Sequence, residues 1–219
     1  MAWTANWWDV AAVAAAPVAG LLVAHASLQL PAGPDRPAPR PGARRCALAV
    51  GLCVAAALWA VAASPGALAL VSAVLGWQLV LIAMVDAEHL WLPHRLTVPL
   101  GLLGLAEAAA LEPEALPHRI IGAVLGFAVL AFIAWAYRRV RGIEGLGGGD
   151  FRLLAAAGAW VGWAGLPTVM LASSFAGLAV VGVRTALRRR VDLREEIPFG
   201  VYLAIGLWLA WLYGPVGAR

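Results

Sequence analysis

The chain has 219 residues, of which 63% are hydrophobic and 13% are charged, and its mean hydropathy is +0.83. A soluble domain of this size could not bury so much apolar surface, so the composition predicts an integral membrane protein. Arginine alone supplies the positive side of the formal net charge of +4, because the chain has no lysine. This bias is typical of a GC-rich genome, and we expect a lipid bilayer rather than nucleic acid as the partner of its surface.

Eight apolar runs follow one another along the chain, and most are long enough to cross a bilayer. They lie at residues 10–30, 46–63, 67–86, 96–111, 119–137, 151–166, 167–184 and 197–213. The sixth and seventh runs are separated only at Gly165-Leu166-Pro167, where the residue before a proline disfavours helical geometry. The sequence therefore predicts an all-α polytopic membrane protein, a bundle of about eight transmembrane helices.

We expect one integral membrane domain over residues 1–219. Residues 1–30 hold the first helix, and the segment from Met1 to Asp9 has no basic residue, so this helix is expected to stay in the membrane rather than act as a cleaved signal peptide. Residues 31–45 combine five prolines with four arginines and are expected to form a short exposed loop. Residues 46–213 hold the remaining helix bundle.

The arginines predict how the bundle is oriented. Fourteen of the sixteen fall in odd-numbered loops: Arg36, Arg40, Arg44, Arg45, Arg95, Arg138, Arg139, Arg141, Arg152, Arg184, Arg188, Arg189, Arg190 and Arg194. Because basic residues collect on the cytoplasmic side, both termini are expected to face away from the cytoplasm. The same reasoning places Asp86 and Asp150 at the cytoplasmic side.

Those two aspartates are the most informative polar residues. Asp86 ends one apolar run, and Asp150 follows a glycine-rich stretch at the start of another. Taken alone, Asp150 would also fit a helix cap. Acids at membrane depth are costly, however, so two of them on one side favour a polar site over two helix caps. Two carboxylates that lie close together do not both ionise easily, and such a pair supplies an acid and a base from identical side chains.

The glycine-rich stretch does not fit two common nucleotide motifs. A phosphate-binding loop needs Gly-Lys-Ser/Thr after its glycines, and the dinucleotide fingerprint needs a third glycine where this chain has Asp150. Glycines beside Asp150 would instead let an extended peptide backbone approach the carboxylate.

Three segments carry a family resemblance. The stretch GLGGGDFRLLAAAGAWVGW, with Gly147, Gly149 and Asp150, resembles the Gly-x-Gly-Asp signature of the type IV prepilin peptidases, which are bacterial inner-membrane aspartic proteases. Asp86, followed seven residues later by Pro93, resembles the family's other catalytic segment. Pro198-Phe199-Gly200 is similar to the Pro-Phe-Gly-Pro of its last helix, and Val201 replaces the second proline.

The resemblance implies an aspartic endopeptidase that removes the basic leader of type IV prepilins or type II secretion pseudopilins at the cytoplasmic face of the inner membrane. Asp86 and Asp150 would be catalytic. The residues that would shape the site or bind substrate are Gly147, Gly149, Glu144, Pro93, Arg152, Pro198, Phe199 and Gly200. Proteolysis would need no metal or other cofactor. S-adenosylmethionine would be needed only if methyl transfer is retained, and here the 31–45 loop stands in place of the zinc domain of longer members.

Other interpretations stay open at this point. A small proton-coupled transporter or channel would use the two acids as a relay, and a catalytically inactive assembly factor of a pilus or secretion system would keep the fold alone. His89 and His94 flank the first aspartate segment but are weak candidates for metal ligands. His25 and Glu107 lie inside predicted helices and would pair with each other, line a cavity or form hydrogen bonds between helices.

Overall fold

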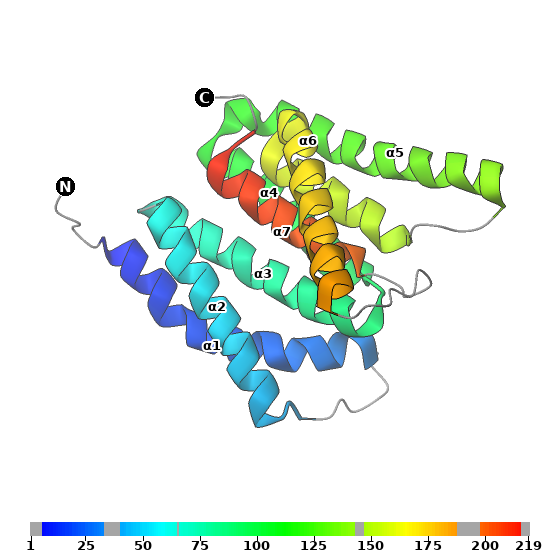
Figure 1. The fold of residues 1–219 in the computed structure, drawn as a ribbon. Coiled ribbons are helices and arrows are strands. Elements are labelled where there is room, and N and C mark those ends of the chain that lie inside the picture. Colours follow the sequence, from blue (N-terminus) through cyan, green and yellow to red (C-terminus); the bar gives the residue numbers. More distant parts are fainter. Residues whose placement is uncertain (1–5, 33–39, 65, 143–146, 188–197, 216–219) are drawn as a thin grey trace. The chain divides into compact units, whose positions relative to one another are not determined.

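The computed structural model of the chain describes residues 6–32, 40–64, 66–142, 147–187 and 198–215 (Figure 1). Within these ranges all regular secondary structure is helical. The elements are α1 (Trp7–Ala32), α2 (Ala43–Ala63), α3 (Ala67–His89), α4 (His94–Leu111), the short 3₁₀ helix η1 (Pro113–Ala115), α5 (Leu116–Arg141), α6 (Gly148–Leu187) and α7 (Phe199–Tyr213). This confirms the predicted all-α class.

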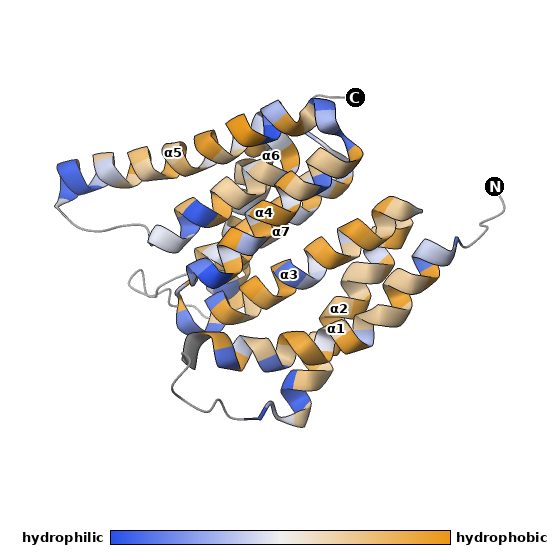
Figure 2. Cartoon of the chain, turned by 180° about the vertical axis from the view of Figure 1, so that it is seen from behind, coloured by the Kyte–Doolittle hydropathy of each residue, from blue (hydrophilic) through white to orange (hydrophobic). Residues whose placement is uncertain are grey.

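Five described segments are long and apolar enough to cross a membrane, and they lie in α1, α2, α3, η1 with α5, and α6. Helix α7 is apolar but has only 15 residues. Figure 2 shows hydrophobic residues along the middle of the helices and hydrophilic ones gathered at several helix ends, for example at the C-terminal end of α5. Large side chains such as Phe175 and Leu178 are about 70% exposed, as expected for helices whose outer faces contact lipid. The chain is a polytopic membrane protein.

The described residues form seven α-helices where the sequence predicts about eight, because the two runs at 151–166 and 167–184 join in α6. Helix α6 is nevertheless interrupted at Gly162, whose φ of 70° and ψ of 176° are not helical. The predicted break at Gly165-Leu166-Pro167 was therefore displaced toward the N-terminus. A proline cannot bond the carbonyl four residues earlier, here that of Trp163, and the adjacent glycine absorbs the kink because it tolerates a positive φ.

The chain divides into two compact units, Met1–Val85 and Asp86–Arg219. In the first unit, α1 packs against α2, and polar contacts tie helix ends to neighbouring segments. The buried Asp9 carboxylate accepts the backbone N–H of Gly66 at 2.8 Å, and Arg45 donates to the Ser27 hydroxyl at 2.9 Å. These bonds satisfy polar groups that would otherwise be costly to bury.

In the second unit, α6 packs against α4, α5 and α7 (Figure 1). Gly158 of α6 lies directly on the backbone of Gly122 in α5, so closely that a side chain on either glycine would collide with the other helix. Small residues allow this approach where helices associate in lipid. The packing holds the first turn of α6, which carries Asp150, firmly on the rest of the unit.

Candidate active site

Asp86 lies in the last turn of α3, and its side chain is 4% exposed. Its Oδ2 accepts the backbone N–H of Val201 at 3.1 Å, and the backbone N–H of Gly200 also bonds this carboxylate. Both donors belong to the first turn of α7, where N–H groups have no partner four residues earlier in the helix. The start of α7 therefore lies against the Asp86 carboxylate.

Gly200 is required for that contact. A Cβ atom at Gly200 would lie 2.8 Å from Asp86 Oδ2 and 2.7 Å from Leu92 Cδ1. Both distances are too short for real Cβ contacts, so any other residue would push α7 away from the carboxylate. Gly200 of the predicted motif Pro198-Phe199-Gly200 thus lies in direct contact with Asp86, Pro198 is the N-cap of α7, and Phe199 is half-buried.

Asp150 lies in the first turn of α6 and is half-buried. The backbone N–H of Gly147 bonds its carboxylate, and its own N–H donates to the Gly147 carbonyl at 3.1 Å. The carboxylates of Asp86 and Asp150 lie close enough to repel each other. Two acids that are 64 positions apart in the sequence are therefore brought into one site.

Leu92 lies between the two glycine segments and was not among the site residues predicted from the sequence. Its side chain is 2% exposed, and a Cβ at Gly149 would lie 2.8 Å from its Cβ and 3.1 Å from its carbonyl oxygen. Gly149 and Gly200 thus contact the same leucine from α6 and α7. The only signal in the sequence is its position beside the buried Pro93, because leucine is too common in such a chain to stand out.

The chain reaches Leu92 through an unusual turn. Leu90 follows α3 with a φ of 50°, and its N–H donates to the Asp86 carbonyl at 2.9 Å. This left-handed residue ends the helix in the way that glycine often does. The turn reverses the chain just after Asp86 and brings Leu92 and Pro93 next to the site.

The remaining predicted site residues are distributed as follows. Gly147 contacts Asp150 without crowding, since a Cβ there would lie an ordinary 3.7 Å from Oδ2. Arg152 donates its Nε to the Gly148 carbonyl at 3.1 Å. Glu144 lies outside the described residues. His89 and His94 are both exposed, and the described residues contain no group of three or more side chains placed to hold a metal ion.

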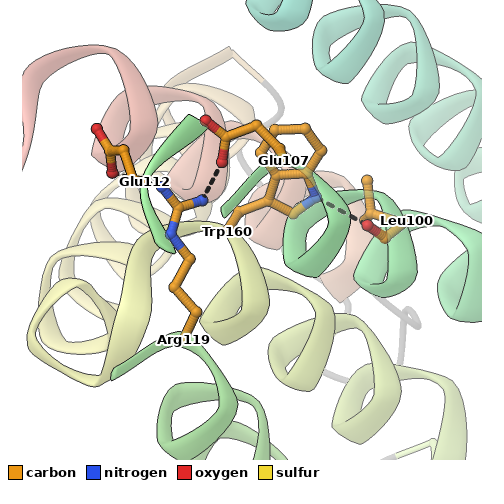
Figure 3. A network of polar contacts seen from close by, with 5 residues as sticks. All are labelled: Leu100, Glu107, Glu112, Arg119 and Trp160. Carbon is orange, nitrogen blue, oxygen red and sulfur yellow. Dashed lines mark hydrogen bonds and ion pairs between the residues drawn. The ribbon is translucent and has the colours of Figure 1, made fainter. Parts of the chain in front are cut away.

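A second buried polar group lies between α4, η1 and α5 (Figure 3). Arg119 donates to Glu107 at 2.5 Å and to Glu112 at 3.1 Å, and its guanidinium lies 5.4 Å from the Trp211 ring centre. Nearby, Trp160 donates its indole N–H to the Leu100 carbonyl. Of the alternatives that the sequence left open for Glu107, the structure shows bonding between helices, with Arg119 as its partner, and His25 instead contacts Gln29.

The arrangement at Asp86 and Asp150 has the parts that a paired-carboxylate acid–base centre needs. Two like charges in proximity favour a state in which one carboxyl keeps its proton and the other is ionised. Backbone N–H groups orient each carboxylate, and glycines line both sides of the pair. An ionised carboxylate can take a proton from water while the protonated one donates to an oxygen that gains charge.

Comparison with known proteins gives a consistent result. Residues 73–182 match the model of the type IV leader peptidase family, and this range contains both aspartates. A protein of Aeromonas salmonicida named prepilin leader peptidase/N-methyltransferase is 42% identical over 151 residues, which cover 69% of this chain and 52% of the relative. A protein of the same name from Pseudomonas aeruginosa is 42% identical over 140 residues, or 64% of this chain and 48% of the relative.

The alignments cover only part of each relative. A further relative with this name, from Dichelobacter nodosus, is 38% identical over 138 residues, or 63% of this chain and 46% of its own length. The chain thus spans about half the length of the curated relatives it matches. No solved structure matches the chain.

Proposed function

The chain belongs to the type IV leader peptidase family, and on that premise we propose that it is a membrane aspartic endopeptidase that removes the leader from type IV prepilins or type II secretion pseudopilins. The observation that carries this proposal is the proximity of Asp86 and Asp150. Burial and mutual repulsion of two carboxylates are unfavourable for folding, so their presence in one site is best explained by chemistry.

The two carboxyl groups would share the work of hydrolysis. The ionised carboxylate removes a proton from a water molecule, whose oxygen attacks the carbonyl carbon of the scissile peptide bond. The protonated carboxyl gives its proton to the carbonyl oxygen as negative charge develops there. As the tetrahedral intermediate collapses and the C–N bond breaks, the carboxyl that took the proton from water passes it to the leaving nitrogen. One hydroxyl of the intermediate returns its proton to the other carboxylate as the carbonyl group re-forms. The pair ends with one proton, ready for another cycle.

The surroundings of the pair support a peptide substrate. Gly147 leaves open space beside Asp150, so an extended chain can approach the carboxylate there, whereas Gly149 packs on Leu92. We further propose that Glu144, Pro93, Arg152, Pro198, Phe199 and Gly200 shape this approach. The acid at Glu144 would attract a basic leader by simple charge complementarity.

Methyl transfer is a separate question. The names of the relatives include N-methyltransferase, which implies S-adenosylmethionine as the methyl donor in those proteins. The groove between α4, α5 and α6 has a volume of about 200 Å³, and its lining is apolar except for Thr97 and Arg152. It is smaller than most sites for small molecules and offers little to a charged nucleoside, so it does not fit this cofactor. We propose proteolysis without a cofactor and derive no step through methyl transfer.

The transporter alternative has weaker support. A proton relay would account for the two acids, but it predicts neither the glycine contacts on Leu92 nor the α7 contact with Asp86. The relatives that the chain matches are named as peptidases. An inactive assembly factor would keep the fold but gives no reason to bury two like charges together.

The decisive experiment uses the purified full chain in detergent and a prepilin with an intact leader. We expect Asp86→Asn and Asp150→Asn each to lower cleavage at least about a thousandfold, because each removes one ionisable partner but keeps the shape. Glu114→Gln, at an exposed acid in η1, is the matched control and should cleave normally. The product mass separates leader loss from methylation. Near-normal cleavage by either aspartate variant, or loss of activity on adding a chelator that zinc then restores, would refute the dyad.

The proposed location is the bacterial inner membrane with both termini periplasmic. When the two parts of α6 that meet at Gly162 are counted as separate crossings, fourteen arginines fall on one side, which predicts that the loops beside Asp86 and Asp150 are cytoplasmic. In a chain whose Cys46 and Cys53 are replaced by alanine, a single cysteine near position 114 should react with an impermeant reagent added to intact cells, and one near position 145 should not. The opposite pattern would reverse the orientation.

A further inference from the structure

The backbone N–H of Val201 donates a hydrogen bond to the Asp86 carboxylate, with 3.1 Å between the nitrogen and Oδ2. The same N–H lies 3.3 Å from the Pro198 carbonyl, so it is shared between a turn bond and the carboxylate. Val201 is the third residue of α7, where an N–H has no partner four residues earlier in the helix. Its bond to Asp86 therefore takes no hydrogen bond between residues four apart away from α7.

This donor is specific to the residue present here. The last motif of the resembled family has a second proline where this chain has Val201, and a proline has no backbone N–H. In this chain the Asp86 carboxylate thus gains one hydrogen bond from the residue that departs from the motif. The side chain of Val201 plays no part in that bond, which makes the contribution separable by mutation.

The two carboxylates differ in what surrounds them. Asp86 accepts backbone N–H groups from Val201 and Gly200, whereas Asp150 accepts one from Gly147. Hydrogen bonds from N–H groups favour the charged form of a carboxylate, and so does the positive end of a helix dipole. Asp86 faces the N-terminus of α7 but also lies in the last turn of α3, whose dipole has the opposite sign there, whereas Asp150 lies in the first turn of α6, so the dipoles do not favour ionisation of Asp86 over Asp150. The additional backbone donor, which among the described residues only Asp86 has, favours the charged form of Asp86.

We propose that Val201 is a positioning residue whose backbone N–H holds Asp86 as the ionised, water-activating member of the pair, so that Asp150 is the member that carries the proton. This inference rests on the proposed function and refines it. In the hydrolytic cycle, Asp86 then takes the proton from water and Asp150 gives its proton to the carbonyl oxygen of the substrate.

Other charged groups around Asp86 do not duplicate this role. From α6 the titratable group that acts on Asp86 is Asp150, which disfavours a second charge. The described first turn of α7, Phe199–Val201, has no ionisable side chain. Glu88 and His89 at the end of α3, and His94 and Arg95 at the start of α4, are exposed to solvent, which screens their charges.

The test compares Val201→Pro with Val201→Ala in the full-length chain. Val201→Pro removes the N–H at a first-turn position, where proline is tolerated, and Val201→Ala removes the side chain but keeps the N–H. Cleavage of a prepilin is measured across a range of about pH 4 to 9, and kcat and KM are determined separately. We expect Val201→Pro to move the acid limb of the kcat profile about one unit to higher pH, with KM little changed.

Val201→Ala should leave the acid limb where it is in the wild type, whatever its rate. A Val201→Pro profile that coincides with the wild-type profile would overturn the inference. An equal displacement in both variants would also overturn it, because the effect would then come from the side chain.

A second measurement covers the case in which Val201→Pro does not fold. With ¹⁵N-labelled valine, the amide proton of Val201 should titrate in the wild type with the midpoint of the acid limb, and this titration should vanish in Asp86→Asn. An amide that behaves identically in both proteins would contradict the hydrogen bond. This readout needs no turnover, so it separates failure of the inference from failure of the proposed peptidase activity.

Discussion

The unit Asp86–Arg219 holds two groups of buried acids, and the two differ in what compensates their charge. Glu107 pairs with Arg119 at 2.5 Å, with side chains that are only 6% and 7% exposed (Figure 3). Asp86 and Asp150 contact backbone N–H groups and repel each other. A compensated acid contributes to one specific packing of the helices, whereas an uncompensated pair destabilises the fold, and the proposed peptidase activity accounts for its presence.

The comparison predicts that removing charge has opposite consequences at the two groups, and the largest effect on stability is expected at Arg119. Arg119→Met leaves Glu107 buried without its partner, so the free energy of unfolding should fall by about 3–5 kcal/mol. The measurement is reversible unfolding in mixed micelles. Adding Glu107→Gln to this variant should recover most of the loss, because the stranded charge is then gone.

Two controls sharpen that prediction. Glu112→Gln removes a partner that is 58% exposed, so it should cost less than about 1 kcal/mol. Asp150→Asn should lose cleavage yet unfold no more easily than the wild type, because it removes a repulsion. If Arg119→Met proved as stable as the wild type, the two groups would not differ in the way described.

Glycines provide the next contrast, because those around the aspartates do not all have the same role. Gly149→Ala and Gly200→Ala place a Cβ 2.8 Å from Leu92 Cβ and from Asp86 Oδ2 respectively. A displacement of this kind at a reacting group should lower kcat/KM roughly a hundredfold. Gly147→Ala, whose Cβ has 3.7 Å to its nearest neighbour, should lower it no more than about threefold, as a steady-state assay would show. Equal losses at all three positions would mean that the substrate, not Leu92, requires the glycines.

The sequence was sufficient for features that depend on composition or on one motif. Apolar runs predicted the helices, and the cost of placing acids at membrane depth singled out Asp86 and Asp150 as a possible pair. The proline at position 167 correctly indicated an interruption, but the glycine that absorbs it, Gly162, lies five residues earlier. Which backbone position yields is decided by helix packing, which a single sequence does not contain.

Other features depend on contacts between distant segments and left no readable signal. The bond from Val201 to Asp86 uses a backbone N–H, which every residue except proline possesses. Leu92 is an ordinary apolar residue in the sequence, and only the folded structure shows that Gly149 and Gly200 pack against it. The partner of Glu107 was also missed, because Arg119 reaches it only once α4 and α5 are joined through η1.

The smallest expected effect concerns the turns that end two helices. Helix α3 ends in Leu90 with a φ of 50°, and α5 ends in Gly142 with a φ of 71°. The left-handed conformation costs a residue with a Cβ about 1–2 kcal/mol relative to glycine, so the turn beside Asp86 is strained where its counterpart is relaxed. Strain of this kind gathers at functional sites when the surrounding structure holds it in place.

We therefore expect Leu90→Gly to be more stable than Leu90→Ala by about 1 kcal/mol, the reverse of the usual order within a helix, because both lose the side chain but only alanine keeps the clash. Gly142→Ala should lose a similar amount, which makes α5 the matched control. Thermal unfolding in one detergent measures all three variants. Leu90→Gly should also cleave more slowly, because the freer turn holds Leu92 and its contacts to Gly149 and Gly200 less firmly. If Leu90→Ala matched Leu90→Gly in both stability and rate, the left-handed turn would be neither strained nor needed to position Asp86.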